Sequence, residues 1–425
     1  MKKKTVLLVG GGGREHAIAK KLAESPLVGK LYAMPGNGGM ESIAQCVPVK
    51  ATDIESMLAL ALAKGVDFVV IAPDDPLVLG AVDALAAAGI PSFGPTAAAA
   101  QIEGSKLFAK ELMKKYNIPT ADYRAFSNPE EALAYLKTAA YPIVVKADGL
   151  VLGKGVTIAH SYAEGEAAIR SIMTEKTFGK SGDRVVIEEF LRGPEVTVLA
   201  FTDGTTIAPM VSSMDHKPVG EGNTGANTGG MGVIAPNPFY TDELAALCMQ
   251  NIFLPTIRAM KAEGRPFRGC LYFGLMLTEA GPKVIEYNCR FGDPETQAVL
   301  PLMESDLMET MLAASQGRLH EAMPRFRRGA SCCVVLASGG YPGRYETGKP
   351  IFFGDSARVE GVTVYHAGTR LEGSGFVTAG GRVLGVTATA CTLNDAVERA
   401  YEAADGIAFE HKYCRRDIGR AALGV

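Results

Sequence analysis

The sequence has no long apolar segment, no basic tail or stripe, and no cysteine pair of the C-x-x-C type. A membrane-spanning helix needs ~18 uninterrupted apolar residues, so we expect no membrane association. The formal net charge of -3 argues against a dedicated nucleic-acid-binding protein and against a polybasic membrane anchor. The eight cysteines are scattered, which predicts buried reduced thiols in a cytoplasmic protein rather than a zinc site.

Common catalytic and targeting signatures are also missing. The chain has neither the G-x-x-x-x-G-K-[ST] loop nor a Ser-His-Asp or Cys-His arrangement, so we expect no protein nucleophile. On this reading His16, His216 and His366 are structural, although His216 stands in "DHK" next to Asp215. Residues 1–16 begin with lysines but hold only a short apolar run. A secretory signal needs an apolar stretch of ~7–15 residues, so this run predicts a first strand.

The composition that is present is that of a globular protein. The 425 residues are 47% apolar and 21% charged, which predicts about three domains with sizeable cores. Strands alternate with helices over residues 1–100, which predicts a doubly wound parallel sheet. Residues 101–326 are of the α+β type and largely antiparallel, and residues 327–425 are strand-rich. We also expect a hairpin turn at Asp203-Gly204 and one long amphipathic helix over residues 294–316.

The first motif with chemical content is "VGGGGREHA" at residues 9–17. A dinucleotide-binding loop would place its third glycine at position 15, which holds Glu15. A tight turn from strand to helix explains part of the pattern. The helix N-terminus, with Arg14 beside it, still suits an anion, so we favour a phosphate-bearing substrate over NAD.

The second motif is "VVKADGLVLGKGVTIA" at residues 144–159, between two apolar runs. Its glycines let backbone amides approach an anion, and its lysines match the charge of a polyphosphate. We therefore expect Lys146 to face a nucleotide and not the core. A mobile surface hairpin would give the same pattern, and the stretch alone does not decide between the two readings.

The third motif is "KVIEYNCRFGDPETQ" at residues 283–297. In a strand, Glu286 and Asn288 point to the same side, with Cα atoms about 7 Å apart. Oxygen ligands so placed suit Mg²⁺ or Mn²⁺ together with nucleotide phosphates. The alternative is the polar outer face of an edge strand. Arg290 and Asp293, which follow at once, weaken that alternative.

These motifs together resemble the phosphoribosylamine–glycine ligase (glycinamide ribonucleotide synthetase) family of the ATP-grasp superfamily. The resemblance covers essentially the whole chain and includes "GGGGREHAIA", "PGNGG", "IEEFLRGPE", "DHKPVGEGNTGANTGGMG" and "GGYPG". It implies a central ATP-grasp fold with a small mobile lid subdomain over about residues 122–192. It also implies ligation of glycine to 5-phosphoribosylamine through an acyl phosphate in de novo purine biosynthesis, with ATP as co-substrate.

The resemblance also assigns roles to residues at matching positions. The ATP-binding residues would be Lys106, Lys146, Gly149, Gly153, Lys154, Gly155, Glu188, Glu189, Leu191 and Glu195. Glu286 and Asn288 would hold the metal, Mg²⁺ or Mn²⁺. The catalytic candidates at the glycine and amine ends of the site would be Asp215, Asn227 and Arg290. The residues around the phosphoribosylamine would be Gly12, Arg14, Glu15, Gly36, Asn37, Asp74 and Arg382.

The chain departs from the family pattern at three places. Asp74 stands where many relatives have glutamate, Pro218 replaces an arginine, and the strand "CLYFGLML" lacks a carboxylate found in many ATP-grasp enzymes. Rival readings are another ATP-grasp ligase, an NAD-binding dehydrogenase and a nonenzymatic nucleotide-binding regulator. We expect only small-molecule partners and a monomer or weak homo-oligomer.

Overall fold

The first hundred residues form a five-stranded parallel sheet in the order β3-β2-β1-β4-β5 in the computed structural model, which describes residues 3–151 and 155–424. The central strand is buried on both faces, as expected for a parallel sheet covered by helices. This confirms the predicted parallel sheet. The strands are β1 (Lys4–Gly10), β2 (Val28–Pro35), β3 (Gln45–Cys46), β4 (Phe68–Ile71) and β5 (Ser92–Phe93), and the helices are α1 (Gly13–Ala23), α2 (Ile54–Ala63), α3 (Asp74–Val78) and α4 (Ala81–Ala87).

The middle of the chain builds an antiparallel sheet in the order β11-β10-β16-β17. The turn between β10 and β11 lies at Asp203-Gly204 as predicted: Asp203 Oδ1 accepts N–H groups from Thr205 and Thr206, and Gly204 has φ +89°. The elements are β10 (Glu195–Asp203), β11 (Ile207–Pro209), β16 (Arg268–Thr278), β17 (Gly281–Asn288), α5 (Ala97–Gly104), α6 (Lys106–Lys115), α9 (Asp242–Cys248) and α10 (Leu254–Ala262).

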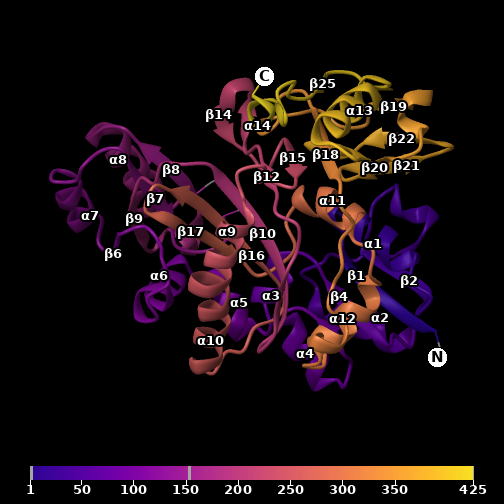
Figure 1. Ribbon diagram of the computed structural model, residues 1–425, viewed down its shortest axis with the longest axis horizontal. Coiled ribbons are helices and arrows are strands. Elements are labelled where there is room, and N and C mark those ends of the chain that lie inside the picture. Colours follow the sequence, from indigo (N-terminus) through magenta and orange to yellow (C-terminus); the bar gives the residue numbers. More distant parts are fainter. Residues whose placement is uncertain (1–2, 152–154, 425) are drawn as a thin grey trace.

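A smaller antiparallel sheet, in the order β6-β9-β7-β8, has its own apolar core against two helices. It forms the end of the molecule farthest from the first and last domains, at the left of Figure 1. The predicted hairpin is present, with Ile143 opposite Ala159. The elements are β6 (Tyr123–Phe126), β7 (Ile143–Ala147), β8 (Val156–Ala159), β9 (Val185–Glu189), α7 (Pro129–Leu136) and α8 (Tyr162–Ile169).

The C-terminal part is strand-rich, as predicted, and α13 packs on its main sheet. That sheet also takes two strands from the middle of the chain, β12 and β15, in the order β12-β15-β18-β23-β20. Its elements are β12 (Met214–Asp215), β15 (Gly232–Ala235), β18 (Ala330–Ser338), β20 (Val362–His366), β23 (Arg382–Ala390), β25 (Lys412–Tyr413) and α13 (Leu393–Asp405). Beside it lie β19 (Pro350–Phe353), β21 (Thr369–Glu372), β22 (Gly375–Thr378), β24 (Ile407–Ala408), α14 (Arg420–Leu423) and the ribbon β13 (Pro218–Gly220) and β14 (Thr224–Asn227).

The prediction of one long helix over residues 294–316 is wrong. The segment forms α11 (Glu295–Val299), a short turn at Leu300–Leu302 and α12 (Leu307–Ser315). Pro301 has no N–H to donate within a helix, and Asp306 begins α12 by accepting the Glu309 N–H at 3.0 Å. The apolar periodicity continues across the break, so the pattern alone suggested one helix.

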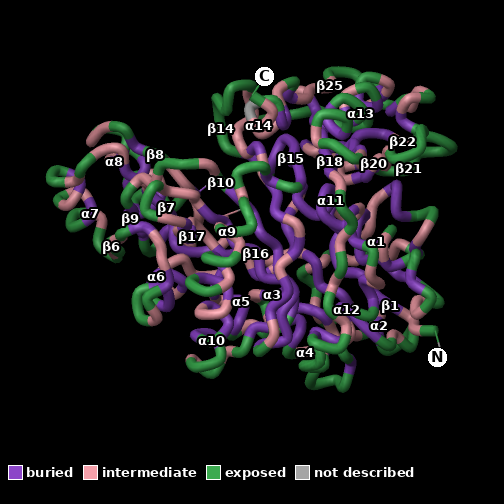
Figure 2. Tube along the Cα trace, in the orientation of Figure 1, coloured by how far each residue is buried: buried purple, intermediate pink, exposed green. Residues whose placement is uncertain are grey.

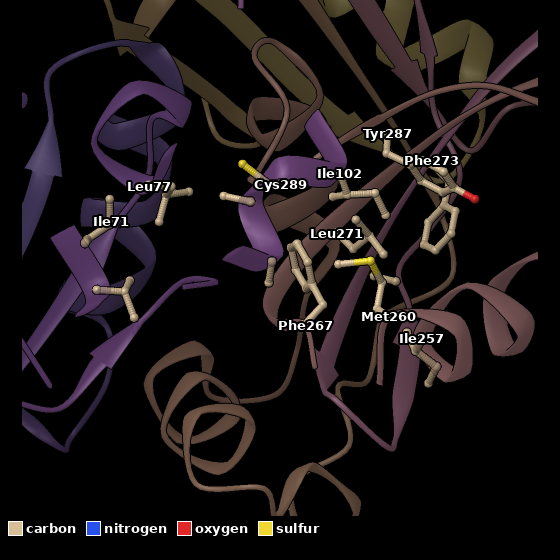
Figure 3. Packing of buried hydrophobic residues seen from close by; sticks show 14 of the residues in the cluster. Ile71, Leu77, Ile102, Ile257, Met260, Phe267, Leu271, Phe273, Tyr287 and Cys289 are labelled. Atoms are coloured by element: carbon tan, nitrogen blue, oxygen red, sulfur yellow. The ribbon is translucent and has the colours of Figure 1, made fainter. Parts of the chain in front are cut away.

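One apolar cluster connects the first sheet with the central sheet. Figure 3 shows Ile71 and Leu77 on one side, Phe273 and Tyr287 on the other, and Ile102 of α5 between them. Figure 2 shows that the buried chain runs continuously through this region, while the helices α7 and α8 on the small sheet alternate between exposed and buried residues. The helix α5 is therefore held by packing on both sides. Among the described residues, no helix is both long and apolar enough to cross a bilayer.

Candidate active site

The predicted metal ligands lie at the end of β17, opposite Gly274 and Tyr272 of β16. Glu286 Oε1 is 3.2 Å from Lys217 Nζ, which is also 3.5 Å from Glu195 Oε2. The Lys217 ammonium lowers the pKa of Glu286 to about 2, and Glu286 raises the pKa of Lys217 well above its usual value. Glu286 is therefore a carboxylate near neutral pH.

The orientation of the Asn288 amide is set by its neighbours. Only one orientation satisfies these neighbours: with its nitrogen toward them, the amide donates to Glu103 Oε1 at 2.9 Å and to the Tyr287 carbonyl at 3.1 Å, whereas the opposite orientation points its oxygen at two acceptors. This assignment leaves the Asn288 oxygen turned away from both groups. The site thus offers one carboxylate and one amide oxygen to a cation.

The sequence predicts that Lys146 faces a nucleotide and not the core, but in the structure its side chain is buried. Its ammonium is buried, 2.9 Å from Glu188 Oε1 and 3.1 Å from the Ile285 carbonyl. The other oxygen of Glu188 lies 3.0 Å from Lys110 Nζ. Burial lowers the pKa of Lys110 to about 8, against the effect of Glu188. The Glu188 carboxylate is thus shared by two lysines, and its backbone pairs with β6 and β7.

The start of the β7–β8 hairpin is tied to α6. Lys106 Nζ donates to the Gly149 carbonyl at 2.8 Å, and Asp148 Oδ1 accepts the Ser105 hydroxyl and the Leu107 N–H. Gly149 has φ +132°, and a Cβ there would lie 2.6 Å from Ser181 Oγ, so glycine is required. Lys146 is therefore part of strand β7 of the hairpin, and Lys106 contacts the hairpin from α6. The predicted Gly153 and Lys154 lie outside the described residues.

The remaining nucleotide candidates occupy the edge of the small sheet and the start of β10. Glu189 is exposed and accepts the Asp122 N–H at 3.0 Å, and its carboxylate pairs with Lys283 at 2.8 Å. Leu191 lies half-buried in the connection from β9 to β10, and Glu195 begins β10. Glu195 reaches the same ammonium of Lys217 as Glu286 does, so it is connected to the metal candidates.

Arg290 lies between two acidic side chains. Its Nε is 3.7 Å from Asp74 Oδ2, and its Nη2 is 3.4 Å from Glu103 Oε1. Nε itself is buried and makes no hydrogen bond within the described residues. Burial raises the pKa of Glu103 to about 7, while Arg290 opposes that shift. A guanidinium held this way has a donor left for a ligand.

Asp215 is the last residue of strand β12. Its Oδ1 is buried and has no hydrogen-bond partner in the described part of the chain. Burial, with Glu295 as a second cause, raises its pKa well above the usual value. A side chain on Gly230 would place a Cβ 2.5 Å from Asp215 Oδ1, so glycine keeps this region open. Asn227 lies exposed on β14, and the neighbouring Thr228 donates its hydroxyl to the Lys217 carbonyl at 2.7 Å.

The predicted phosphate-binding residues gather where α1 meets the end of β2. Arg14 Nε pairs with Glu15 Oε1 at 2.7 Å, and Glu15 Oε2 accepts the Gly12 N–H. Asn37 donates to the carbonyls of Gly11 and His366 at 2.9 and 2.8 Å. Gly36 has φ +74°, and a side chain there would collide with Cys46.

Two arginines from distant segments reach the loop that follows β17. Arg14 Nη1 donates to the Phe291 carbonyl at 3.0 Å. Arg382 Nη1 donates to the carbonyls of Gly229 and Asp293, and its Nη2 lies 3.3 Å from Asp293 Oδ2. The loop thus connects the first sheet with the C-terminal sheet.

Pro218, the second departure from the family pattern, begins strand β13. Its carbonyl accepts a hydrogen bond from Arg415 Nη1 at 3.0 Å. At the third departure, Gly274 stands opposite Glu286, where a Cβ would lie 3.0 Å from Glu286 Cγ. The described part of β16 therefore offers no carboxylate opposite Glu286.

Comparison with known proteins agrees with this arrangement. Three models of phosphoribosylglycinamide synthetase match in order: the N domain over residues 4–103, the ATP-grasp (A) domain over 104–296 and the C domain over 331–421. The chain belongs to the phosphoribosylglycinamide synthetase family. The phosphoribosylamine–glycine ligase of Yersinia pestis is 47% identical over 422 residues, covering 98% of this chain and 99% of that protein. That of Escherichia coli strain K12 is 47% identical, covering 98% of both chains.

Two solved structures have folds similar to that of this chain. The crystal structure of phosphoribosylamine–glycine ligase from Thermotoga maritima has a TM-score of 0.84 and 33% identity, covering 97% of this chain and all of that one. The biotin carboxylase domain of the Hydrogenobacter thermophilus 2-oxoglutarate carboxylase has a TM-score of 0.75 at 17% identity, covering 97% of this chain and 92% of that one. The second likeness concerns the fold alone. The predicted ATP-grasp architecture is confirmed by the match to the ATP-grasp (A) domain model over residues 104–296.

Sequence reasoning missed three residues that shape this family member's site: Lys217, Lys110 and Glu103. Lys217 had a local signal, because it completes the "DHK" sequence after Asp215 and His216. Lys110 and Glu103 had none, because their partners lie 78 and 186 residues away. His216 is structural, as expected: its ring is buried, and Nε2 accepts the Gly419 N–H at 3.2 Å.

Proposed function

We propose that this chain catalyses the ATP-dependent ligation of glycine to 5-phosphoribosylamine in de novo purine biosynthesis. The products are glycinamide ribonucleotide, ADP and phosphate. The observation that carries the proposal is the match to phosphoribosylamine–glycine ligases over 98% of the chain. The residues assembled at the end of β17 supply the charges that this chemistry needs.

ATP binds between the small sheet and the central sheet in this proposal. Lys106 and Lys146 neutralise its phosphates, and the amides near Gly149 and Gly155 approach them. The adenine meets the chain near Glu188, Glu189 and Leu191, partly through backbone atoms, and Glu195 meets the ribose. Support comes from the two lysines at this hairpin: Lys146 lies in its strand β7, and Lys106 donates to the Gly149 carbonyl.

Glu286 and Asn288 would hold a divalent cation, Mg²⁺ or Mn²⁺. The donor set fits, because an ionised carboxylate and an amide oxygen are hard ligands. The described residues contain no group of three or more acidic, histidine or cysteine side chains placed to hold a metal. That suits a cation that takes its other ligands from nucleotide phosphate and water. When bound, such a cation neutralises charge on the transferring phosphoryl group.

The reaction needs glycine to become an electrophile. Its carboxylate oxygen attacks the γ-phosphorus of ATP, ADP leaves, and a glycyl acyl phosphate forms. The neutral amine of phosphoribosylamine then attacks the acyl carbon, and phosphate leaves with the bonding electron pair. The new amide nitrogen loses a proton. Lysine ammonium groups stabilise the charge on the phosphoryl oxygens.

The chain's own residues bind and orient the two substrates in this proposal. Arg290, with its free Nε, and Asp215, with its unpartnered oxygen, hold the ends of glycine and the amine. Asn227, exposed at the end of β14, is the third candidate at these ends of the site. Arg14 and Arg382 bind the ribosyl phosphate, with Gly12, Glu15, Gly36 and Asn37 shaping its surroundings and Asp74 near the ribosylamine.

The proposed function also has consequences for the domains, the location and the oligomeric state of the protein. We divide the chain into domains at 1–100, 101–326 and 327–425, with the small sheet, residues 122–192, as a subdomain that closes over ATP. We place the protein in the cytoplasm as a monomer or weak homo-oligomer. The proposal of a separate closing subdomain rests on the small sheet's own apolar core.

The test measures ADP release with ATP, glycine and freshly made phosphoribosylamine, omitting each in turn. We expect release only when all three are present. A panel of other amino acids in place of glycine separates this ligase from another ATP-grasp ligase. Release that is independent of phosphoribosylamine, or faster with another amino acid, would overturn the proposal.

A further inference from the structure

One buried carboxylate holds three consecutive residues at the end of β17. Glu103 Oε2 accepts the Cys289 N–H at 2.7 Å. Glu103 Oε1 lies 2.9 Å from the Asn288 amide nitrogen and 3.4 Å from Arg290 Nη2. Glu103 itself is buried, with 8% of its surface exposed. It comes from α5, 186 residues earlier in the chain, so these contacts join two segments that share no local structure.

The chemistry of these contacts is directional. The Cys289 N–H and the Arg290 guanidinium favour the ionised form of Glu103, against the effect of burial. In that form the carboxylate only accepts hydrogen bonds, so the Asn288 amide presents its nitrogen to Glu103 and its oxygen to the opposite side. The Tyr287 carbonyl, 3.1 Å from the same nitrogen, favours the same orientation, and Glu103 adds the shorter contact. The same carboxylate is one of the two acidic groups beside Arg290, whose Nε stays unbonded. One side chain therefore fixes a metal-ligand candidate and a substrate-binding candidate together.

We propose that Glu103 is a positioning residue of the ligase reaction, which holds the Asn288 oxygen ready for the divalent cation and the Arg290 guanidinium ready for substrate. The proposal rests on the proposed function for the identity of those ligands. It assigns Glu103 no contact with a reacting atom. Residues that orient a metal ligand in this way are known to affect metal affinity by about 10- to 100-fold.

The helix that carries Glu103 is a suitable support. Thr96 caps α5 by accepting the Ala99 N–H, and Ile102 packs in the apolar cluster that includes Leu271 and Phe273 (Figure 3). A carboxylate on a helix packed on both sides has little freedom to move. Positioning residues require this rigidity, because a loose support lets the ligand rotate.

The test compares Mn²⁺ binding to the ADP-bound protein, followed by electron paramagnetic resonance, in wild type and Glu103→Gln. Gln keeps the shape but offers a single acceptor oxygen to the three donors of Asn288, Cys289 and Arg290, so the orientation of the Asn288 amide is held less firmly. We expect Mn²⁺ affinity to fall by about 10-fold or more. We expect the Mn²⁺ concentration for half-maximal ligation to rise with it. Glu111→Gln, exposed on α6, is the matched control and should change neither value.

Three outcomes decide the matter. Unchanged Mn²⁺ affinity in a folded Glu103→Gln protein overturns the proposal, even if its melting temperature falls, because Glu103 would then be a structural group only. If Glu103→Gln does not fold, Glu103→Asp decides: it keeps the charge beside Arg290, shortens the reach, and must weaken Mn²⁺ binding. A wild type that binds Mn²⁺ with ADP but ligates nothing overturns the proposed function alone, because the binding comparison stands without turnover.

Discussion

At the scale of single residues, this site is built from charges that share partners. Glu286 and Glu195 share Lys217, Lys110 and Lys146 share Glu188, and Asp74 and Glu103 share Arg290. Removing one member therefore leaves another buried or half-buried charge with fewer partners. Each substitution should show its effect on stability as well as on binding.

Replacing Glu286 with Gln tests the metal assignment. The two side chains are nearly isosteric, so we expect the fold to persist. One negative charge leaves the cation site, so turnover should fall by about 100-fold or more, with a higher Mg²⁺ requirement. ADP release measured against Mg²⁺ concentration checks this. Glu279→Gln, exposed between β16 and β17, is the control. Activity near that of wild type at limiting Mg²⁺ would rule out Glu286 as a ligand.

Lys146→Met should weaken ATP binding and also destabilise the protein. Its ammonium is buried against Glu188 and the Ile285 carbonyl, so its loss leaves Glu188 with Lys110 alone. We expect the free energy of unfolding to fall by about 1–3 kcal/mol. Denaturant unfolding and ATP titration measure the two effects. Lys110→Met should cost similar stability with a smaller loss of ATP affinity. Equal ATP affinity in wild type and Lys146→Met would remove Lys146 from the nucleotide site.

The sequence suggested those site candidates whose positions follow from short-range spacing. Glu286 and Asn288 follow from a two-residue spacing in a strand, and Arg290 follows from the next turn. Glu103 could not be predicted in this way. Its role depends on a helix and a strand end that the fold brings together, and no short-range pattern encodes that meeting.

At the scale of elements, strands were easier to predict than helix boundaries. Turn residues located the hairpin at Asp203-Gly204, and the glycine-rich stretch lies in the hairpin at residues 143–159. The helix expected over residues 294–316 failed, because apolar spacing continued through Pro301 while the backbone hydrogen bonds did not. The pairing of β15 with β18, which brings β12 into the same sheet, was also out of reach, since β15 and β18 are about 100 residues apart.

The start of α12 gives a prediction at this scale. Asp306 Oδ1 accepts the Glu309 N–H at 3.0 Å, and its Oδ2 accepts the Ser25 hydroxyl at 2.7 Å. Asp306→Ala removes both bonds, so we expect a loss of about 1–2 kcal/mol in the free energy of unfolding. Urea denaturation measures it. Glu304→Ala, which removes an exposed charge nearby, should be close to neutral. Equal losses in both variants would show that the cap contributes nothing.

At the scale of the whole molecule, buried histidines join segments that are far apart in the chain. His16 Nδ1 on α1 accepts the backbone N–H of His366 in β20 at 2.8 Å, and the two rings lie 5.6 Å apart. His216 accepts the Gly419 N–H. An accepting ring nitrogen carries no proton, so these contacts require neutral imidazoles. The contacts between the first sheet and the C-terminal sheet are therefore sensitive to acid.

The protein should lose stability as the pH falls below about 6.5. Burial lowers the pKa of His16 to about 3 and those of His216 and His366 to about 4. In that range the unfolded chain binds protons that the folded chain does not, so the free energy of unfolding falls with pH. Each histidine contributes up to about 1.4 kcal/mol per pH unit until its folded pKa is reached. His16→Gln should remove one such contribution from the slope measured by urea unfolding between about pH 7 and pH 5. His320→Gln, whose ring is 65% exposed, is the control. A slope that is the same in His16→Gln as in wild type would mean that His16 takes up a proton without unfolding, and that its contact with His366 tolerates charge.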